Sequence, residues 1–284
     1  INPTQVESTG TPVGITIDID NDLRFGDDSY TVTGTAPDIG ADEAEFIFLD
    51  IILPVIVYTP IPNQTTLVAP NLQATITDNI GVNVIAGTKP RLYFKRFTDN
   101  NTYVDNTNAT NGWKYVESSS VANPFDFTID YNLLFGTPPT GITTIQYFVV
   151  AQDLAPNIAV NQAIFNSAPS SVGLVAANFP VTGTINSYNI LVFSGIVTVG
   201  TNPGNIFPSL TNNGGAFEAI NGAVLVGDLT LEITTDLLIE SGTHPLNQWV
   251  ESGVGNYTLT IRPNANIQRV ITGTYSGANA AVAG

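Results

Sequence analysis

The sequence has 284 residues and no cysteine, which excludes disulfide bonds and thiolate metal sites. Its single histidine, His244, excludes a histidine pair as metal ligands. Methionine is also absent, so Ile1 is not a translation start. We expect either that a leader has been removed or that the sequence is an excerpt of a longer chain.

Charge is scarce and strongly unbalanced. Only 11% of the residues are charged, and 24 acidic residues against 8 basic ones give a formal net charge of −16. Such a field repels a phosphate backbone and an anionic lipid surface, which argues against nucleic acid and membrane surfaces as partners. The acidity is explained by solubility outside the cell, or more specifically by calcium binding.

Long apolar runs are missing as well. The most apolar stretch, residues 46–58, is interrupted by Asp50 and Pro54 and is too short to span a bilayer, so we predict no membrane insertion. Helix signals are nearly absent, whereas short alternating apolar runs end repeatedly in Gly, Pro, Asn or Asp. The sequence therefore predicts an all-β fold, with one two-turn helix over residues 214–221, where Phe217 and Ile220 share a side.

The clearest pattern lies in residues 71–180, which read as a self-contained antiparallel β-sandwich. Leu72, Ala74 and Ile76 alternate with polar residues and are expected to point inward. Trp113 is expected to be a core anchor or a cap over one open end. The Asn-rich loop at residues 98–112 is expected to be exposed.

The flanking segments also carry strand signals. Apolar residues alternate over residues 13–19, which predicts a strand with Val13, Ile15, Ile17 and Ile19 on one face. Four prolines in residues 54–70 deny hydrogen-bond donors to a sheet, which fits an edge strand or a linker.

Three stretches resemble parts of known secreted bacterial proteins. The pair DIDNDLR and PDIGADE, at residues 18–24 and 37–43, resembles the closing coil of right-handed parallel β-helix proteins, with Asn21 where the family usually has Gly. The central runs, from NLQATITDNIGV to IQYFVVAQD, resemble the immunoglobulin-like module of large surface proteins of Bacteroidota-type bacteria. FPSLT, GGAFEAIN, HPLNQW and YTLTIRP resemble the opening of a parallel β-helix, in which a short helix covers the first coil.

These resemblances imply an all-β chain with a central immunoglobulin-like β-sandwich flanked by partial parallel β-helix (solenoid) segments. The implied parts are the last coils of a β-helix-like block at 1–53, a Pro-rich hinge at 54–70, the sandwich at 71–180, a connector at 181–195, and a cap with the first coils of a second block at 196–284. The chain stops where further coils would be expected. That order fits a window cut from a tandem array, or two partial helices that dock on each other.

Three groups of side chains are candidate ligand sites. Five aspartates could bind calcium through their oxygens, although the usual Gly and Glu of a calcium loop are absent and turns explain them equally well: Asp18, Asp20, Asp22, Asp27 and Asp28. A second calcium site is conceivable among aspartates at strand ends and loop tips: Asp78, Asp99, Asp105 and Asp153. Tyr103, Trp113 and Tyr115 could form a platform for surface glycans, with burial in the core as the alternative.

Catalysis is not expected. Parallel β-helices can host polysaccharide-acting enzymes that use carboxylates and a basic residue, and Arg24, Arg262 and Arg269 are the basic residues in the relevant segments. Each is explained as a surface strand residue, so we predict no enzyme.

The function predicted from the sequence is that of a structural or adhesive segment of an extracellular, repetitive surface protein or filament that associates with itself end to end. The alternative is a glycan-binding or protein-binding module of a secreted adhesin. A polysaccharide-acting enzyme is the third candidate.

Overall fold

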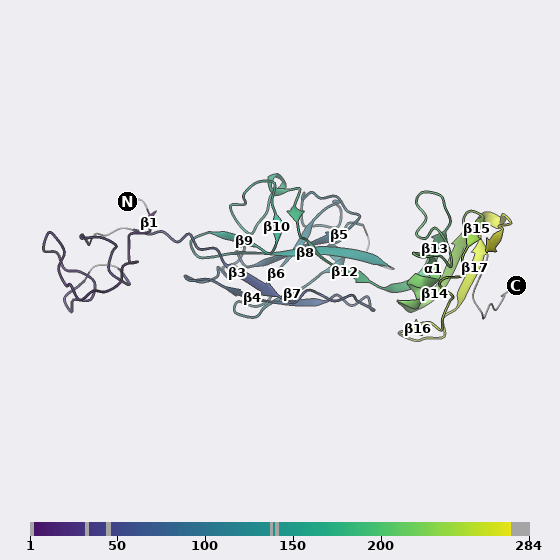
Figure 1. Ribbon diagram of the computed structural model, residues 1–284, viewed down its shortest axis with the longest axis horizontal. Coiled ribbons are helices and arrows are strands. Elements are labelled where there is room, and N and C mark those ends of the chain that lie inside the picture. Colours follow the sequence, from purple (N-terminus) through teal and green to yellow (C-terminus); the bar gives the residue numbers. More distant parts are fainter. Residues whose placement is uncertain (1–2, 32–33, 44–46, 137–138, 140–141, 274–284) are drawn as a thin grey trace.

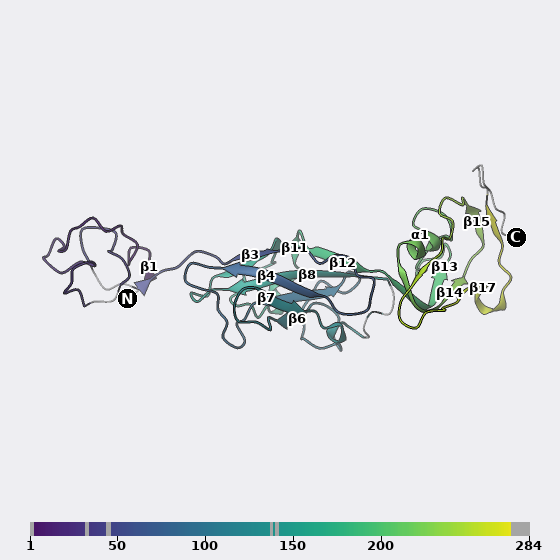
Figure 2. The same cartoon turned by 90° about the horizontal axis from the view of Figure 1, so that it is seen from below.

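The protein is elongated, with three parts in a row along its long axis (Figures 1 and 2). The computed structural model describes residues 3–31, 34–43, 47–136, 139 and 142–273. We refer to residues 3–53 as the N-terminal part, 54–190 as the central part and 191–273 as the C-terminal part. The fold is nearly all β, which confirms the predicted class.

The strands are short and the helices few. In chain order the strands are β1 (Pro3–Thr4), β2 (Ile47–Phe48), β3 (Val55–Tyr58), β4 (Asn71–Thr77), β5 (Arg91–Arg96), β6 (Lys114–Glu117), β7 (Phe125–Thr128), β8 (Thr143–Gln152), β9 (Ile158–Val160), β10 (Ala163–Ile164), β11 (Thr182–Gly183), β12 (Asn186–Ile190), β13 (Val192–Val199), β14 (Val224–Ile233), β15 (Leu237–Glu240), β16 (Val250–Glu251), β17 (Leu259–Pro263) and β18 (Ile271–Gly273). The helices are α1 (Ala216–Asn221) and three single 3-10 turns, η1 (Tyr131–Leu133), η2 (Ala176–Asn178) and η3 (Asn264–Asn266).

The central part contains two antiparallel sheets that share one apolar core. One sheet has the order β3-β4-β7, and the other has the order β12-β8-β5-β6, with β9 also paired to β8. Along β4, Leu72, Ala74 and Ile76 are buried while their neighbours are exposed, as the alternation predicted. These side chains meet Phe94 of β5 and Val149 of β8 in the core between the sheets.

The outer face of the larger sheet is buried too. Tyr93, Trp113, Phe148 and Val150 pack there under the segment formed by residues 163–181. The Tyr93 hydroxyl donates to the Val172 carbonyl at 2.7 Å and accepts from the Leu174 amide at 2.9 Å, which fixes this cover on the sheet. The prediction that Trp113 is a core anchor is therefore confirmed.

The two sheets extend beyond residues 71–180 at both ends. β3 lies inside the Pro-rich segment 54–70 and is the outer strand of its sheet, so the edge-strand alternative holds for residues 55–58. β12 lies inside the predicted connector at 181–195 and pairs with β8 over five residues. Both segments are thus partly sheet, because β3 pairs with β4 and β12 pairs with β8.

The prediction of a strand over residues 13–19 is wrong. Among the described residues of the N-terminal part, only β1 and β2 form a strand pair, and Ile17 makes a single isolated bridge to Leu23. Val13 and Ile19 are each 71% exposed. The left-handed backbone of Gly14, with φ of 73°, bends the segment, and no second layer covers its apolar side chains.

Polar contacts hold the N-terminal part together instead, and they join the two motifs that resemble a closing coil. The Arg24 guanidinium pairs with the Glu43 carboxylate at 3.1 Å and donates to the carbonyls of Asp38 and Gly40. The Asp18 carboxylate accepts from the Glu43 amide at 3.2 Å. Glu43 of the second motif therefore holds the turn of the first motif in place.

The C-terminal part is built from parallel strand pairs. β13, β14 and β17 form one parallel sheet, in which β16 also pairs with β14, and β15 pairs in parallel with β18. Apolar side chains of β13 and β14 form its core together with Ala216 and Ile220 of α1. The predicted helix is confirmed, and it begins at Ala216 with Phe217 and Ile220 both packed on this core.

A buried carboxylate organises one end of the C-terminal part. Glu240 of β15 is 8% exposed and accepts four hydrogen bonds from the residues before α1. The donors are the Ser209 hydroxyl, the Leu210 amide, and the amide and hydroxyl of Thr211. One side chain thus satisfies the backbone that leads into α1.

We predict that Glu240→Gln destabilises the C-terminal part by about 1–3 kcal/mol, because an amide oxygen cannot replace two charged acceptors and the amide group adds a buried donor. Thermal unfolding measures the loss of stability, and hydrogen exchange of the β15 amides shows that the loss lies in the C-terminal part. Glu232→Gln is the matched control, because its exposed pair with Arg262 is worth less than about 1 kcal/mol. Equal stability of both variants would contradict the role given to Glu240.

Candidate functional site

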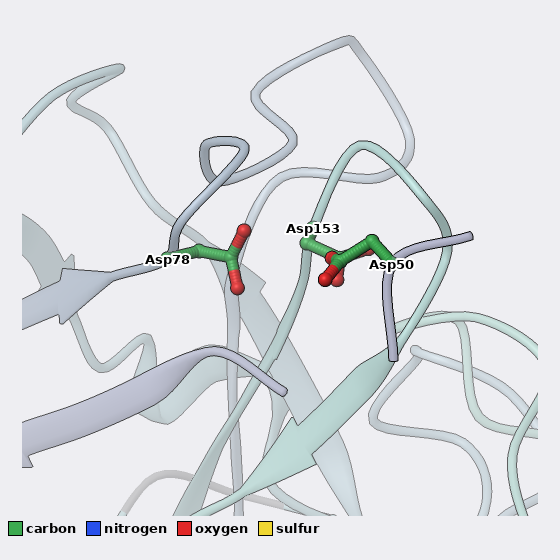
Figure 3. A group of neighbouring side chains, drawn as sticks. All are labelled: Asp50, Asp78 and Asp153. Carbon is green, nitrogen blue, oxygen red and sulfur yellow. The ribbon is translucent and has the colours of Figure 1, made fainter. Parts of the chain in front are cut away.

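Three aspartates meet at one corner of the central part. Asp50 precedes β3, Asp78 follows β4 and Asp153 follows β8. Each places a carboxylate oxygen within 4.8 Å of the others, and no other group of three or more His, Cys, Asp or Glu residues comes together in this way in the part of the chain that the structure describes. Figure 3 shows the Asp78 carboxylate pointing toward those of Asp50 and Asp153.

Local turns place two of these side chains. One oxygen of Asp78 accepts from the amides of Ile80 and Gly81 at 2.9 and 3.1 Å, which closes the turn after β4. One oxygen of Asp153 accepts from the Asn157 amide at 2.8 Å and closes the turn after β8 in the same way. A short polar residue at each strand end is therefore required by the turn itself.

Two asparagines bring Asp50 to this corner. The Asn157 side chain donates to Asp153 at 2.7 Å and to the Asp50 carbonyl at 3.1 Å. The Asn79 side chain donates to the Asp50 carboxylate at 3.1 Å, and the Ile52 amide does so as well. The chain entering the central part is thus tied to the turns after β4 and β8.

The corner is acidic, and two of its three aspartates are buried while Asp78 is half-buried. Asp50 is 3% exposed and Asp153 is fully buried. Oδ2 of Asp78 is shielded from solvent and has no hydrogen-bond partner among the described residues. None of the ion pairs between described residues includes any of the three aspartates.

The electrostatics of Asp50 favour its charged form. Burial raises the pKa of Asp50, but hydrogen bonds with Asn79, Ile52, Asp153 and Asn157 outweigh burial, so its pKa lies below the ordinary value. The charged form of Asp50 therefore lies at a corner where no described lysine or arginine forms an ion pair with it. Chemically, the arrangement is suited to holding a cation.

The five aspartates predicted as calcium ligands are not brought together. Asp18 is buried, and one of its oxygens accepts from the amides of Asp20 and Asp22 at 2.9 and 2.8 Å. Asp27 accepts from the Ser29 amide, and Asp20, Asp22 and Asp28 are exposed. Backbone amides, which are the usual partners of turn aspartates, thus bind the carboxylates of Asp18 and Asp27.

The three aromatic residues proposed for glycans have different environments. Trp113 is fully buried, and its indole nitrogen donates to Asn101 at 2.8 Å, so no face of the ring is open to a sugar. Tyr103 and Tyr115 are half-buried and pack against Tyr93. The Arg91 guanidinium lies 4.1 Å from the Tyr115 ring centroid.

The three arginines considered for catalysis have structural partners. Arg24 pairs with Glu43, Arg262 lies 3.4 Å from Glu232 on the neighbouring strand, and Arg269 donates to Asn264. His244 contacts Asn213 and Glu218 in a surface loop.

Sequence reasoning reached the candidate cation site only in part. Asp78 and Asp153 were among the secondary calcium candidates, because aspartates at strand ends are available as ligands. Asp50 was missed as a ligand. Its signal was an acidic residue inside the most apolar stretch of the chain, where a charge needs a specific partner.

Comparisons with models of known protein families and with curated proteins gave no match. Among the described residues, no helix is long and apolar enough to cross a membrane.

We predict that Trp113→Ala lowers the free energy of unfolding of the central part by about 3–5 kcal/mol, because it empties the core around Phe148. Tyr103→Ala should cost clearly less, since the Tyr103 side chain is only half-buried. Denaturant unfolding followed by tryptophan or tyrosine fluorescence compares the two. A stable, unchanged fold of Trp113→Ala would contradict the placement of this ring in the core.

A second prediction concerns acid. Burial raises the pKa of Asp18, but the amides of Glu43, Asp22 and Asp20 outweigh burial and hold the pKa below its usual 3.8. The ordering that this carboxylate provides is therefore present above pH 3.8 and lost as the pH falls through the lower folded value.

Amide NMR shifts of Asp20, Asp22 and Glu43 should move together in this acid range. Asp18→Asn should abolish the common transition, while the control Asp27→Asn should leave it in place. Independent shifts of the three amides would show that Asp18 does not join them.

Proposed function

We propose that the chain is a structural segment of an extracellular, repetitive surface protein or filament, and that it associates end to end with copies of itself. The observation that carries the proposal is the C-terminal part, where parallel sheets end in strands with one partner each among the described residues. β17 pairs with β14 and β18 with β15, and Ile261 and Ile271 on these edges are 44% and 47% exposed. An unpaired edge of this kind is a template for another strand.

In this proposal the C-terminal part is the beginning of a parallel β-helix. The parallel register supports it: Leu229 of β14 lies beside Leu259 of β17, and Leu237 of β15 lies beside Ile271 of β18. Both pairs join positions about 30 residues apart, within the range of solenoid repeats. The helix α1 with its buried Ala216 and Ile220 is then the cap of the first coil.

The N-terminal part is the end of such a block in the same proposal. Its strand pair β1–β2 is parallel, and the contacts of Arg24 and Asp18 join the two motifs that resemble a closing coil. Val13, Ile15, Ile17 and Ile19 are exposed, and a coil lying beside them would cover them. The two outer parts thus carry the surfaces through which neighbouring copies would meet.

The central part is then an immunoglobulin-like spacer. Two antiparallel sheets around one core support this interpretation, and the position between the outer parts fits a rigid separator (Figure 1). The scarcity of charge, the lack of cysteine and the polar, uncharged residues fit a secreted surface protein. We propose no catalytic role.

Recognition of glycans or proteins by the central part is a weaker candidate. Trp113, the residue best suited to stack on a sugar, is buried, so only the half-buried Tyr103 and Tyr115 are left.

Sedimentation velocity and negative-stain electron microscopy of the purified chain test the proposal. We expect species that grow in length with concentration, and stronger association at high salt, because salt screens repulsion between copies that each carry a net charge of −16.

The variants Ile261→Lys and Ile271→Lys should weaken association by placing a charge on the open edges. Val175→Lys is the matched control, since this exposed residue lies in the central part. A compact monomer at every concentration, or equal effects of all three variants, would contradict end-to-end association.

A further inference from the structure

We propose that Asp50, Asp78 and Asp153 bind one calcium ion, which fastens the chain entering the central part to the turns after β4 and β8. This site goes beyond the proposed function and does not depend on it, because the three aspartates belong to one copy of the chain and lie away from the sheet edges of the C-terminal part.

The first support is an oxygen without a partner. Oδ2 of Asp78 is shielded from solvent, yet no described group donates a hydrogen bond to it. A buried carboxylate oxygen left in this way costs free energy, so native structures supply a donor, a water or an ion. The Asp78 carboxylate points toward Asp50 and Asp153 (Figure 3), and one of its oxygens lies within 4.8 Å of theirs, so an ion between the three would bind the carboxylate that carries this oxygen.

The second support is the uncompensated charge. Asp50 and Asp153 are buried side by side and share a hydrogen bond, and their other partners are asparagine side chains and backbone amides. A hydrogen bond between two carboxylates needs a proton, and none of the ion pairs between described residues brings a lysine or arginine to this corner. A divalent cation would take the place of that proton and leave the hydrogen bonds from the asparagines and backbone amides in place.

The third support is the size and type of the ligand set. Oxygens on opposite sides of calcium are separated by about 4.6–5.2 Å, since each lies about 2.3–2.6 Å from the ion. The carboxylate oxygens here lie within 4.8 Å of one another, so calcium fits among them with little movement. Calcium accepts irregular oxygen shells, whereas magnesium requires nearly ideal octahedral geometry and holds its waters tightly, so the set favours calcium.

The remaining ligands are close at hand. Asn79 and Asn157 use their amide nitrogens on Asp50 and Asp153, and each also carries a side-chain carbonyl oxygen. Asp78 lines an open hollow of about 310 Å³, which admits water near this corner. Three carboxylates with water and amide oxygens make up the six to eight oxygens that calcium takes.

The location gives the ion a mechanical effect. Asp50 lies in the segment that joins the N-terminal part to β3, and the next three residues, Ile51, Ile52 and Leu53, are more than half exposed. Hydrogen bonds from the side chains of Asn79 and Asn157 tie this segment to the central part. An ion bound by Asp50, Asp78 and Asp153 would add a direct link and stiffen the joint.

Titration calorimetry with calcium chloride on the chelator-treated full chain tests the site. We expect one calcium per chain, unchanged in the control variants Asp20→Asn and Asp22→Asn, which remove exposed carboxylates of the first predicted site. Asp78→Asn should bind roughly tenfold more weakly or not at all. The same titration in the Ile271→Lys variant, which is expected to weaken assembly, makes failure to bind calcium and failure to assemble separate results.

Thermal unfolding supplies a readout that a purely structural aspartate would not give. Without calcium, Asp78→Asn should be at least as stable as the parent chain, because it removes a repulsive charge while its amide oxygen still accepts in the turn. With millimolar calcium the order should reverse, because only the parent chain gains stability from the ion. Asp50→Asn should show the same reversal and serves if Asp78→Asn does not fold.

Several results would overturn the proposal. These are no binding heat together with no calcium-dependent rise in melting temperature, full binding by Asp78→Asn, or loss of binding in Asp20→Asn or Asp22→Asn. An equal response to magnesium would overturn the choice of calcium.

Discussion

The fold depends on burial of both faces of one strand, β8. On one side its residues join the core shared with the smaller sheet, and on the other they pack with Tyr93 and Trp113 under the segment 163–181. β8 also pairs with β5, β9 and β12, so it connects the middle of the molecule to the strand that leads into the C-terminal part. Asp153 directly follows the last residue of β8 and lies in the acidic corner. Because β8 is fixed in the core, the position of this carboxylate is fixed as well.

Buried carboxylates recur in all three parts, and they are satisfied in different ways. Asp18 is surrounded by backbone amides, and Glu240 receives four hydrogen bonds from the chain before α1. Each is one charge among several donors, an arrangement that stabilises a turn without an ion. At Asp50, Asp78 and Asp153 the balance differs, because three carboxylates share a few neutral donors and Oδ2 of Asp78 has no donor among the described residues.

Sequence patterns succeeded where the physics is local. Leu72, Ala74 and Ile76 alternate in the sequence and are buried in β4, and the helix at residues 216–221 follows the apolar spacing of Phe217 and Ile220. Alternation failed at Val13 to Ile19, because an apolar face becomes a strand only when another strand and a second layer receive it. The spacing of the five aspartates in the N-terminal part predicted calcium ligands. Spacing alone does not show which backbone amides a carboxylate will meet, and Asp18 and Asp27 meet such amides.

The amino-acid sequence alone was enough to establish an all-β chain, the inward faces of its central strands and the exclusion of thiol chemistry, since these follow from composition and from periodicity over a few residues. Tertiary structure decided which strands pair in parallel, that residues 55–58 and 186–190 belong to the central sheets, and that Trp113 is inaccessible. It also decided that Asp50, Asp78 and Asp153 meet. Three segments far apart in the chain form that corner, and only the packing of complete sheets brings them within reach of one ion.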